Sequence, residues 1–373
     1  MRAGPGQTVA GRYQVTDRPP AGDEALARVA VDARSGVRVL LEPVELPELL
    51  VPELTGSNDF AASRWLDPEP VLAELAAAIA AVPEHPRLGQ SFEAVAEDGV
   101  VWLAVERPAA VRLTELLAGG PPPSPYRAAE LAADLAGALA AVHRAGRVHG
   151  NVLPEQVLIC EDGAALLGGL AVGTAQEALA RELGGGDPRR WGQARAGLVG
   201  DRAERWPPEL LTDLGAAGPP ADLWALGVLL HRVLTGRGPF PEHSQTVLFA
   251  AVRSGNRGDR AGCGPLGPLV DRLLAPDPAA RPTAAQTRAW LAGLLAEAPE
   301  PFRSEPAAGT LPVPRPRRLP AARPRAGRPA RAEPHHRHAA AARRPSKLLP
   351  VLLVGGVLAA MALAMAAVVA FAH

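Results

Sequence analysis

Apolar and polar residues alternate along residues 26–46, on either side of Arg34-Ser35-Gly36. A period of two predicts two strands joined by a turn. Residues 71–82 are rich in alanine and repeat their apolar positions at helical spacing, which predicts an amphipathic helix. Residues 100–106 form a short continuous apolar run, so we expect a buried strand there.

Helical patterns dominate the chain beyond this point. Further helices are predicted at about residues 112–118, 127–145, 222–234 and 283–296. Strands therefore concentrate in the first third of the globular region and helices in the rest of it. This order favours an α+β protein with a small sheet lobe and a larger helical lobe.

Two different segments follow the globular region. Residues 298–347 consist largely of Pro, Ala and Arg, and they lack the apolar side chains that would offset the entropy of ordering. We expect a linker without fixed structure. Residues 348–372, from Leu348 to Ala372, carry no charge. A helix of this length spans about 37 Å, which is enough to cross a hydrocarbon layer of ~30 Å, so one transmembrane helix is expected.

The charge is balanced overall but unevenly spread. The formal net charge is zero, yet residues 301–347 hold eleven arginines and Lys347 against only Glu305 and Glu333. The basic flank lies before the expected span, which predicts a single-pass protein of the cell membrane with a cytoplasmic N-terminal domain and an outside C-terminus. The arginines suit contact with anionic lipid headgroups or simple solvation. Nucleic acid is not expected, because no aromatic residue is interspersed among them.

Two further features of the sequence indicate the compartment in which the protein lies. Residues 1–20 are polar and hold no apolar core of a signal peptide. Cys160 and Cys263 are too few for a disulfide framework, which favours a reducing cytosol.

Residues 143–159 read HRAGRVHGNVLPEQVLI. This stretch resembles the catalytic loop of the eukaryotic-like Ser/Thr protein kinases of bacteria, and the resemblance extends over about residues 11–296. Further matching elements follow in the family's order: Glu106-Arg107-Pro108 as a hinge, W206-P-P-E, A221-D-L-W-A-L-G-V-L-L and D277-P-A-A-R-P-T. The resemblance implies a tail at 1–10 and a two-lobed kinase-like domain at 11–297, with a small lobe at about 11–107 and a large lobe at about 108–297.

Several structural positions of the family are occupied as the resemblance requires. Glu209 and Arg281 stand where the family makes a buried ion pair. Asp222 stands where a carboxylate at a helix start holds the catalytic-loop backbone, and His149 where an imidazole packs beneath the metal-binding segment. Glu74 is, by rough position, the helix glutamate that would pair with the strand lysine.

The chemical positions of the family are not occupied. Only Gly22 remains of the family's glycine-rich loop. Glu106 and Pro108 stand at the hinge positions. The other departures are Glu42 for the strand lysine, Asn151 for the base, Leu153 for the loop lysine, Gln156 for the metal-binding asparagine and Gly169 for the metal-binding aspartate. The globular region has no lysine that could substitute, because Lys347 is the only one in the chain.

These losses predict a chain that is not an enzyme: a membrane-anchored pseudokinase scaffold that recruits cytoplasmic protein partners. No cofactor or metal is expected, and ATP binding should be weak or absent. Two alternatives stay open, a weak or atypical Ser/Thr kinase and a nucleotide or ligand sensor without catalysis. The segment from Gly169 to Glu209 has Thr174 as its only hydroxyl residue, so a phosphorylation switch there is not expected.

Overall fold

The computed structural model describes most of the globular region. The described residues are 4–17, 27–50, 63–185, 187–199, 204–212, 217–241, 243–258 and 261–298. The chain divides into two units, Met1–Arg303 and Ser304–His373. The expected transmembrane helix and all but the first residue of the expected linker lie outside the described residues, so both stay predictions. Within the described ranges, no helix is both long and apolar enough to cross a membrane.

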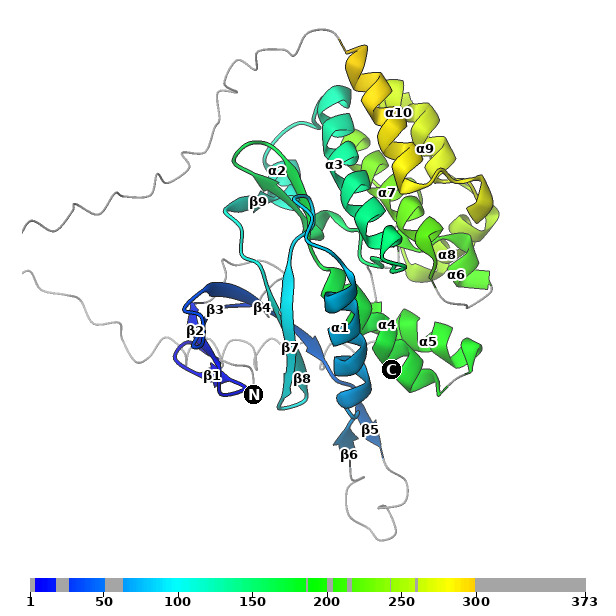
Figure 1. Cartoon of the computed structure of the whole chain (residues 1–373). Helices are drawn as coiled ribbons and strands as arrows, with labels where there is room; N and C mark the ends of the chain where they lie inside the picture. Colours follow the sequence, from blue (N-terminus) through cyan, green and yellow to red (C-terminus); the bar gives the residue numbers. More distant parts are fainter. Residues whose placement is uncertain are drawn as a thin grey trace, which may run out of the picture. The chain divides into compact units, whose positions relative to one another are not determined.

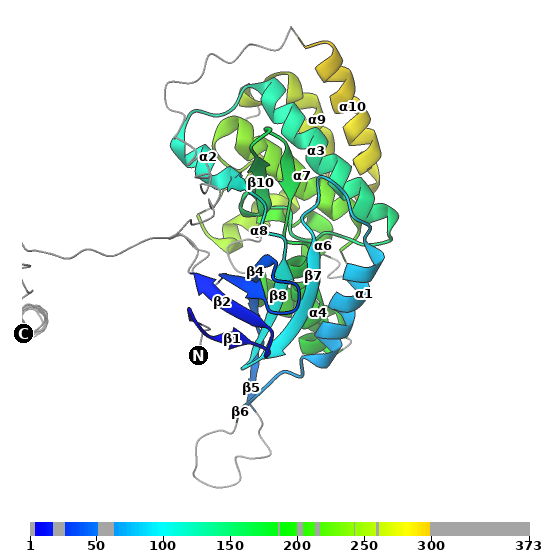
Figure 2. The same cartoon turned by 60° about the vertical axis from the view of Figure 1, so that its left-hand side comes forward.

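A six-stranded antiparallel sheet forms the small lobe (Figure 1, Figure 2). Its strand order is β1-β2-β3-β4-β8-β7. The strands are β1 (Thr8–Val9), β2 (Tyr13–Asp17), β3 (Arg28–Asp32), β4 (Arg38–Glu45), β7 (Ser91–Glu97) and β8 (Val100–Val105). A separate small sheet pairs β5 (Glu48–Leu50) with β6 (Ser63–Trp65). The predicted hairpin is therefore present as β3 and β4, and Gly36 turns between them with a φ of 72°.

Two side chains, one just before β2 and one at its first residue, contact β7, which lies at one edge of the sheet. The Arg12 guanidinium donates to the Asp32 carboxylate at 2.7 Å and also pairs with Glu93. The Tyr13 hydroxyl donates to the same Glu93 carboxylate at 2.8 Å. These contacts curl the sheet around a buried cluster of Val9, Tyr13, Val15, Ala30, Val39, Leu41, Trp102 and Ala104.

Helix α1 (Glu69–Ala81) is the amphipathic helix expected from the alanine-rich pattern. It lies beside β7 and β8 in both views (Figure 1, Figure 2). Val71 and Leu75 are fully buried and join Val101 and Leu103 of β8 in one cluster. This packing fixes α1 against the sheet.

The large lobe is helical, and each helix predicted for it is present. Its helices are α2 (Leu113–Gly119), α3 (Pro125–Arg144), α6 (Pro208–Thr212), α7 (Pro219–Thr235), α8 (Gln245–Ser254), α9 (Gly267–Leu273) and α10 (Ala284–Ala296). Helix α7 lies at the centre, with nearly every residue from Ala221 to Leu234 buried. Ser124 caps α3, and Thr283 forms a capping box at the start of α10.

A small sheet frames the loop that resembles the catalytic loop. Strand β10 (Val157–Cys160) lies between β9 (Ala110–Arg112) and β11 (Ala165–Leu167). The short 3-10 helix η2 (Pro154–Gln156) leads directly into β10. The loop before η2 is thereby held between the central helices and this sheet.

Two helices that the sequence pattern did not predict follow β11. Helix α4 (Leu170–Gly184) and helix α5 (Pro188–Val199) pack against each other as a hairpin. Gly169 and Gly185 flank α4 in the left-handed conformation, with φ values of 78° and 57°. Helix α4 also buries Ala171, Ala175 and Leu179 in the same cluster as α1 and the sheet. The segment after the catalytic loop therefore belongs to the core of the small lobe.

Candidate functional site

The carboxylate of Asp222 fixes the backbone at the start of the site. It accepts hydrogen bonds from the N–H groups of His149 and Gly150, each at 2.8 Å. Its Oδ2 also lies 2.8 Å from His143 Nε2. Asp222 is buried near the start of α7, so the central helix of the large lobe sets the position of this loop.

His149 packs inside the protein beneath this loop. Its ring is fully buried, and its Nδ1 accepts a hydrogen bond from the Asn151 N–H at 3.3 Å. Burial lowers the pKa of His149 to about 4, which keeps the imidazole neutral. The side chain therefore serves as an uncharged support for the loop.

Asn151, at the position of the family's base, is also fully buried. Its Nδ2 donates to the Gly169 carbonyl at 3.2 Å. Its Oδ1 has no hydrogen-bond partner among the described residues. A buried acceptor left unpaired costs roughly 1–3 kcal/mol, so a hydrogen-bond donor that reached this oxygen would recover free energy.

Gln156 fills the space that a side chain at position 169 would enter. A Cβ atom at Gly169 would lie 2.4 Å from Gln156 Oε1 and 2.8 Å from Asn151 Nδ2. Gly169 also has a φ of 78°, which an aspartate adopts only with strain. The two amides and the glycine thus form one packed group. Leu153, at the position of the loop lysine, is buried beside them at the start of η2.

On the small lobe, Glu42 lies in β4 opposite Leu103 of β8. The neighbouring strand brings Arg28 opposite Leu41. The Arg28 guanidinium is buried and donates to the Ala27 carbonyl at 2.9 Å. A carboxylate thus takes the place of an ammonium in the strand that faces the cleft in the family, which disfavours a phosphate there.

The hinge residues connect β8 to β9. Glu106 accepts from the Gln90 N–H through its side chain at 3.2 Å, and its own N–H donates to the Gln90 carbonyl at 2.8 Å. Pro108 lies half-buried in the same connection. Gly22, from the degenerate glycine-rich loop, lies outside the described residues.

The residues present do not fit a metal held in the family's manner. Mg²⁺ prefers carboxylate oxygens with substrate phosphates, whereas Gly169 and Gln156 offer only a carbonyl and an amide here. In the part of the chain that the structure describes, no group of three or more His, Cys, Asp or Glu side chains is placed to hold a metal ion.

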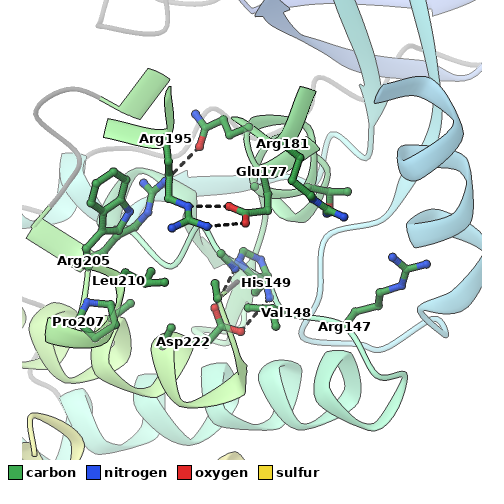
Figure 3. Close-up of a pocket in the computed structure, with 18 of the residues that line it drawn as sticks. Arg147, Val148, His149, Glu177, Arg181, Arg195, Arg205, Pro207, Leu210 and Asp222 are labelled. Carbon is green, nitrogen blue, oxygen red and sulfur yellow. Dashed lines mark hydrogen bonds and ion pairs between the residues drawn. The ribbon is translucent and has the colours of Figure 1, made fainter. Parts of the chain in front are cut away.

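A cavity of about 310 Å³ lies below α4, between the α4–α5 hairpin and the catalytic loop (Figure 3). Arginines from several elements line it together with His149 and Asp222: Arg147, Arg181, Arg195 and Arg205. Arg195 pairs with Glu177 through two contacts of 2.9 and 2.7 Å, drawn as dashed lines in Figure 3. This pair joins α5 to α4.

Glu74 of α1 has a partner that the sequence reasoning missed. Its carboxylate accepts a hydrogen bond from Arg147 at 2.6 Å and lies 3.9 Å from the Arg181 guanidinium. Arg147 comes from the loop before His149, and Arg181 from α4. The sequence indicates this pairing only indirectly. The globular region holds no lysine, so an ion-pair partner of Glu74 was to be sought among the arginines.

The remaining structural pair lies below the site. Arg281 donates to both carboxylate oxygens of Glu209, at 2.6 and 2.8 Å. The guanidinium also lies 4.9 Å from the centre of the Trp224 ring. The ion pair thus holds α6 against α7 and against the segment before α10.

Comparison with known proteins relates this architecture to one family. Residues 62–290 match the protein kinase domain. The serine/threonine-protein kinase PknL of Mycobacterium tuberculosis is 34% identical over 128 residues, which cover 34% of this chain and 29% of the relative. The Aurora/IPL1-related protein kinase 2 of Caenorhabditis elegans is 30% identical over 179 residues, 45% of this chain and 51% of the relative. The aligned regions thus span 29% and 51% of these two relatives' length.

These comparisons correct one expectation from the sequence. The chain was expected not to be an enzyme, because the groups at Glu42, Asn151 and Gly169 differ from those of the family. The domain match and the named Ser/Thr kinase relatives point instead to a protein kinase enzyme. The expectation counted missing side chains, whereas phosphoryl transfer depends on positioning and electrostatic stabilisation rather than on covalent chemistry by single residues, so these substitutions do not by themselves decide whether the chain is an enzyme.

Proposed function

Because this chain belongs to the protein kinase family, we propose that it is a weak, atypical Ser/Thr protein kinase. The Oδ1 of Asn151, which has no hydrogen-bond partner among the residues that the structure describes, carries the proposal. This oxygen is an acceptor at the position of the family's base, and its amide is oriented by the bond from Nδ2 to the Gly169 carbonyl. A substrate hydroxyl that donates to Oδ1 would be held in place for transfer.

The expected rate is low. An amide does not take up a proton at neutral pH, and loss of a general base typically slows a reaction by about 10²–10⁴-fold. The Glu42 carboxylate, which stands at the position of the strand lysine, also weakens attraction for nucleotide phosphates. The residues here therefore orient the hydroxyl and hold the loop rigid, but they do not move its proton.

Phosphate transfer to a Ser/Thr peptide by the full chain tests the proposal. Asn151→Asp restores a carboxylate and should raise the rate by about 10²-fold or more, whereas Asn151→Ala should abolish transfer. Asn256→Asp makes the same chemical change at an exposed position and should leave the rate unchanged. Transfer by the parent that Asn151→Ala does not reduce would contradict the proposed role of Asn151.

We also propose that the kinase acts at a membrane. The uncharged run from Leu348 to Ala372 supports a single span, and the arginines before it support a cytoplasmic kinase domain that contacts anionic headgroups. Deletion of residues 348–372 should move the protein from the membrane fraction to the soluble fraction. Retention in the membrane after this deletion would locate the attachment elsewhere.

A scaffolding role would follow from the same location. Cytoplasmic proteins bound to a membrane-held kinase domain are brought close to one another and to its site. Recovery of a stoichiometric partner with the full chain, but not with a chain lacking residues 11–297, would support this role. Recovery of the same partner with both chains would assign binding to the basic segment.

A further inference from the structure

Basic side chains meet where α3, α10 and the connection from α1 to β7 come together. Helices α3 and α10 lie side by side in both views (Figure 1, Figure 2). His85 comes from the connection, Arg144 from the last turn of α3 and Arg288 from α10. None of these three residues lines the cavity of Figure 3, so their surface is separate from the candidate site.

Gly137 leaves room for two of these side chains on the surface of α3. A Cβ atom at Gly137 would lie 3.7 Å from His85 Cε1 and 3.9 Å from both Cδ and Nε of Arg288. The imidazole and the base of the guanidinium therefore converge over the same turn of α3. Arg144 follows Gly137 by about two helical turns, so both residues lie on one face of this helix.

The arginines at this surface carry more positive charge than the neighbouring carboxylate balances. Arg87 pairs with Asp134, with 2.9 Å between Nε and Oδ1. Arg144 and Arg288 are exposed, and neither forms an ion pair with an acidic side chain among the residues that the structure describes. Two guanidinium charges therefore have no counter-ion from the described part of the chain.

The ionisation of His85 reflects this excess of positive charge. Burial lowers the pKa of His85, and three nearby positive charges lower it further: Arg144, Arg288 and Arg87. The Asp134 carboxylate acts in the opposite direction. His85 Nδ1 accepts a hydrogen bond from the Arg87 N–H at 3.2 Å, so the neutral ring carries its proton on Nε2. The imidazole thus adds an N–H donor to the group without adding a further charge.

A phosphate monoester has the charge and the acceptors that suit this arrangement. It carries nearly two negative charges at neutral pH and three acceptor oxygens. Guanidinium groups bind such oxygens through paired, charge-assisted hydrogen bonds. A carboxylate supplies only one charge, so it would leave one of the two arginines without compensation.

From this geometry we infer that the surface formed by His85, Arg144 and Arg288 binds a phosphate monoester. The group comes from a soluble molecule or from a lipid headgroup, because both present the same chemistry. The inference goes beyond the proposed kinase activity and does not depend on it. Only the lipid source rests on the proposed membrane location.

Modification of arginines in the full chain tests the site residue by residue. Phenylglyoxal reacts with accessible guanidinium groups, and mass spectrometry of the digested protein gives the rate at each arginine. With the chain in discs of phosphatidylcholine, glycerol 3-phosphate well above its Kd should slow the modification of Arg144 and Arg288 about fivefold or more. Chloride at the same ionic strength should not. Arg189, an exposed arginine of α5, is the control whose rate should stay the same.

Variants show whether the two arginines act together. Arg288→Ala should reduce the protection of Arg144 to about twofold or less, and Arg288→Lys should leave an intermediate value, because an ammonium keeps the charge without the planar fork of donors. Arg189→Ala removes the same charge elsewhere and should leave the protection of Arg144 unchanged. Equal protection of Arg144 in the parent and in Arg288→Ala overturns the site.

Discs that contain phosphatidic acid distinguish the two sources. Protection of Arg144 and Arg288 in these discs without glycerol 3-phosphate supports a lipid headgroup as the ligand, whereas protection by glycerol 3-phosphate alone supports a soluble phosphate. Protection by neither, or equal protection of Arg189, overturns the inference.

The same measurements separate this inference from the proposed function. Phosphate transfer to a soluble peptide should be equal in the parent and in Arg288→Ala, because Arg288 lies outside the candidate site. Protection of Arg144 in a parent that transfers no phosphate keeps the site and ends the proposed kinase function. Protection by glycerol 3-phosphate in a chain without residues 348–372 keeps the site even if the proposed membrane location fails.

Discussion

Arg281 and Glu209 form a two-point ion pair that joins α6 to the segment before α10, with contacts of 2.6 and 2.8 Å. The Arg281 side chain is completely buried in this pair. It also donates to the carbonyl oxygens of Ala275, Pro220 and Pro276. One guanidinium thus bonds to three backbone carbonyl groups as well as to the carboxylate.

Arg281→Ala should therefore lower the free energy of unfolding by about 3–5 kcal/mol, because it leaves the Glu209 carboxylate without its partner and removes three hydrogen bonds to backbone carbonyl groups. Arg281→Lys should recover only part of this, since an ammonium lacks the planar fork of donors. Chemical denaturation of the full chain measures both values. The control is Arg190→Ala, which breaks the exposed pair with Asp187. It should change the stability by about 1 kcal/mol or less.

Asp222→Asn changes the support of the catalytic loop without changing its size. The carboxylate accepts three hydrogen bonds, from the N–H groups of His149 and Gly150 and from His143 Nε2. An amide has one acceptor oxygen and presents N–H donors to at least one of these N–H groups. We expect a loss of about 2–3 kcal/mol in unfolding free energy and faster amide exchange at residues 149–151. Unchanged exchange there would show that the loop is held by other contacts.

Sequence reasoning located the structural side chains of the large lobe well. Asp222, Glu209 and Arg281 each lie within a short local pattern that resembles the family. Their roles could be assigned because these patterns place them at fixed positions relative to helix starts and turns. The hairpin at 26–46 and helix α1 were likewise predicted by strong periodicity.

The pairing of Glu74 could not be predicted in this way. Arg147 lies 73 residues further along the chain, and no local periodicity relates the two positions.

Helix α4 was missed for a different reason. Gly173 and Gly184 interrupt its alanine-rich pattern and suggest a loop. The structure explains both glycines by close approach, of Gly173 to the His149 carbonyl and of Gly184 to the Trp191 backbone.

Gly169→Asp should not restore a metal site. The new side chain would start 2.4 Å from Gln156 Oε1, at a backbone φ of 78°. We expect the variant to unfold at lower denaturant and to show no stabilisation by Mg²⁺. Gly169→Ala and Gly185→Ala separate the steric overlap with Gln156 from the strain of a positive φ. Gly185 also has a positive φ, but a Cβ atom there meets nothing within 4 Å. Gly185→Ala should cost only the conformational strain of about 1–2 kcal/mol, and Gly169→Ala should cost more.

Metal-dependent stabilisation of Gly169→Asp would contradict this account. It would mean that Gln156 moves aside easily and that the three residues do not form a packed group. The double variant Gly169→Asp with Gln156→Ser removes the obstructing amide. Calorimetric titration of Mg²⁺ with nucleotide into both variants shows whether the Gln156 amide obstructs metal binding.

The buried imidazole of His149 should make the stability depend on pH. Burial lowers its pKa from 6.5 to about 4 in the folded chain, so the unfolded chain binds a proton first as the pH falls. The stability from this group is complete above pH 6.5 and is lost as the pH falls from 6.5 toward 4, by about 3 kcal/mol in total. The Arg12 guanidinium lowers the pKa of Asp32 below its usual value of 3.8, so the stability from Asp32 is lost only at lower pH. Unfolding free energies measured between pH 7 and 4.5 should therefore fall in the parent and fall less in His149→Phe, whatever the baseline cost of that substitution. Equal slopes of the unfolding free energy against pH in the two proteins would contradict this account. They would mean that other groups cause the acid sensitivity and that the His149 imidazole takes up a proton in the folded state as readily as in the unfolded state.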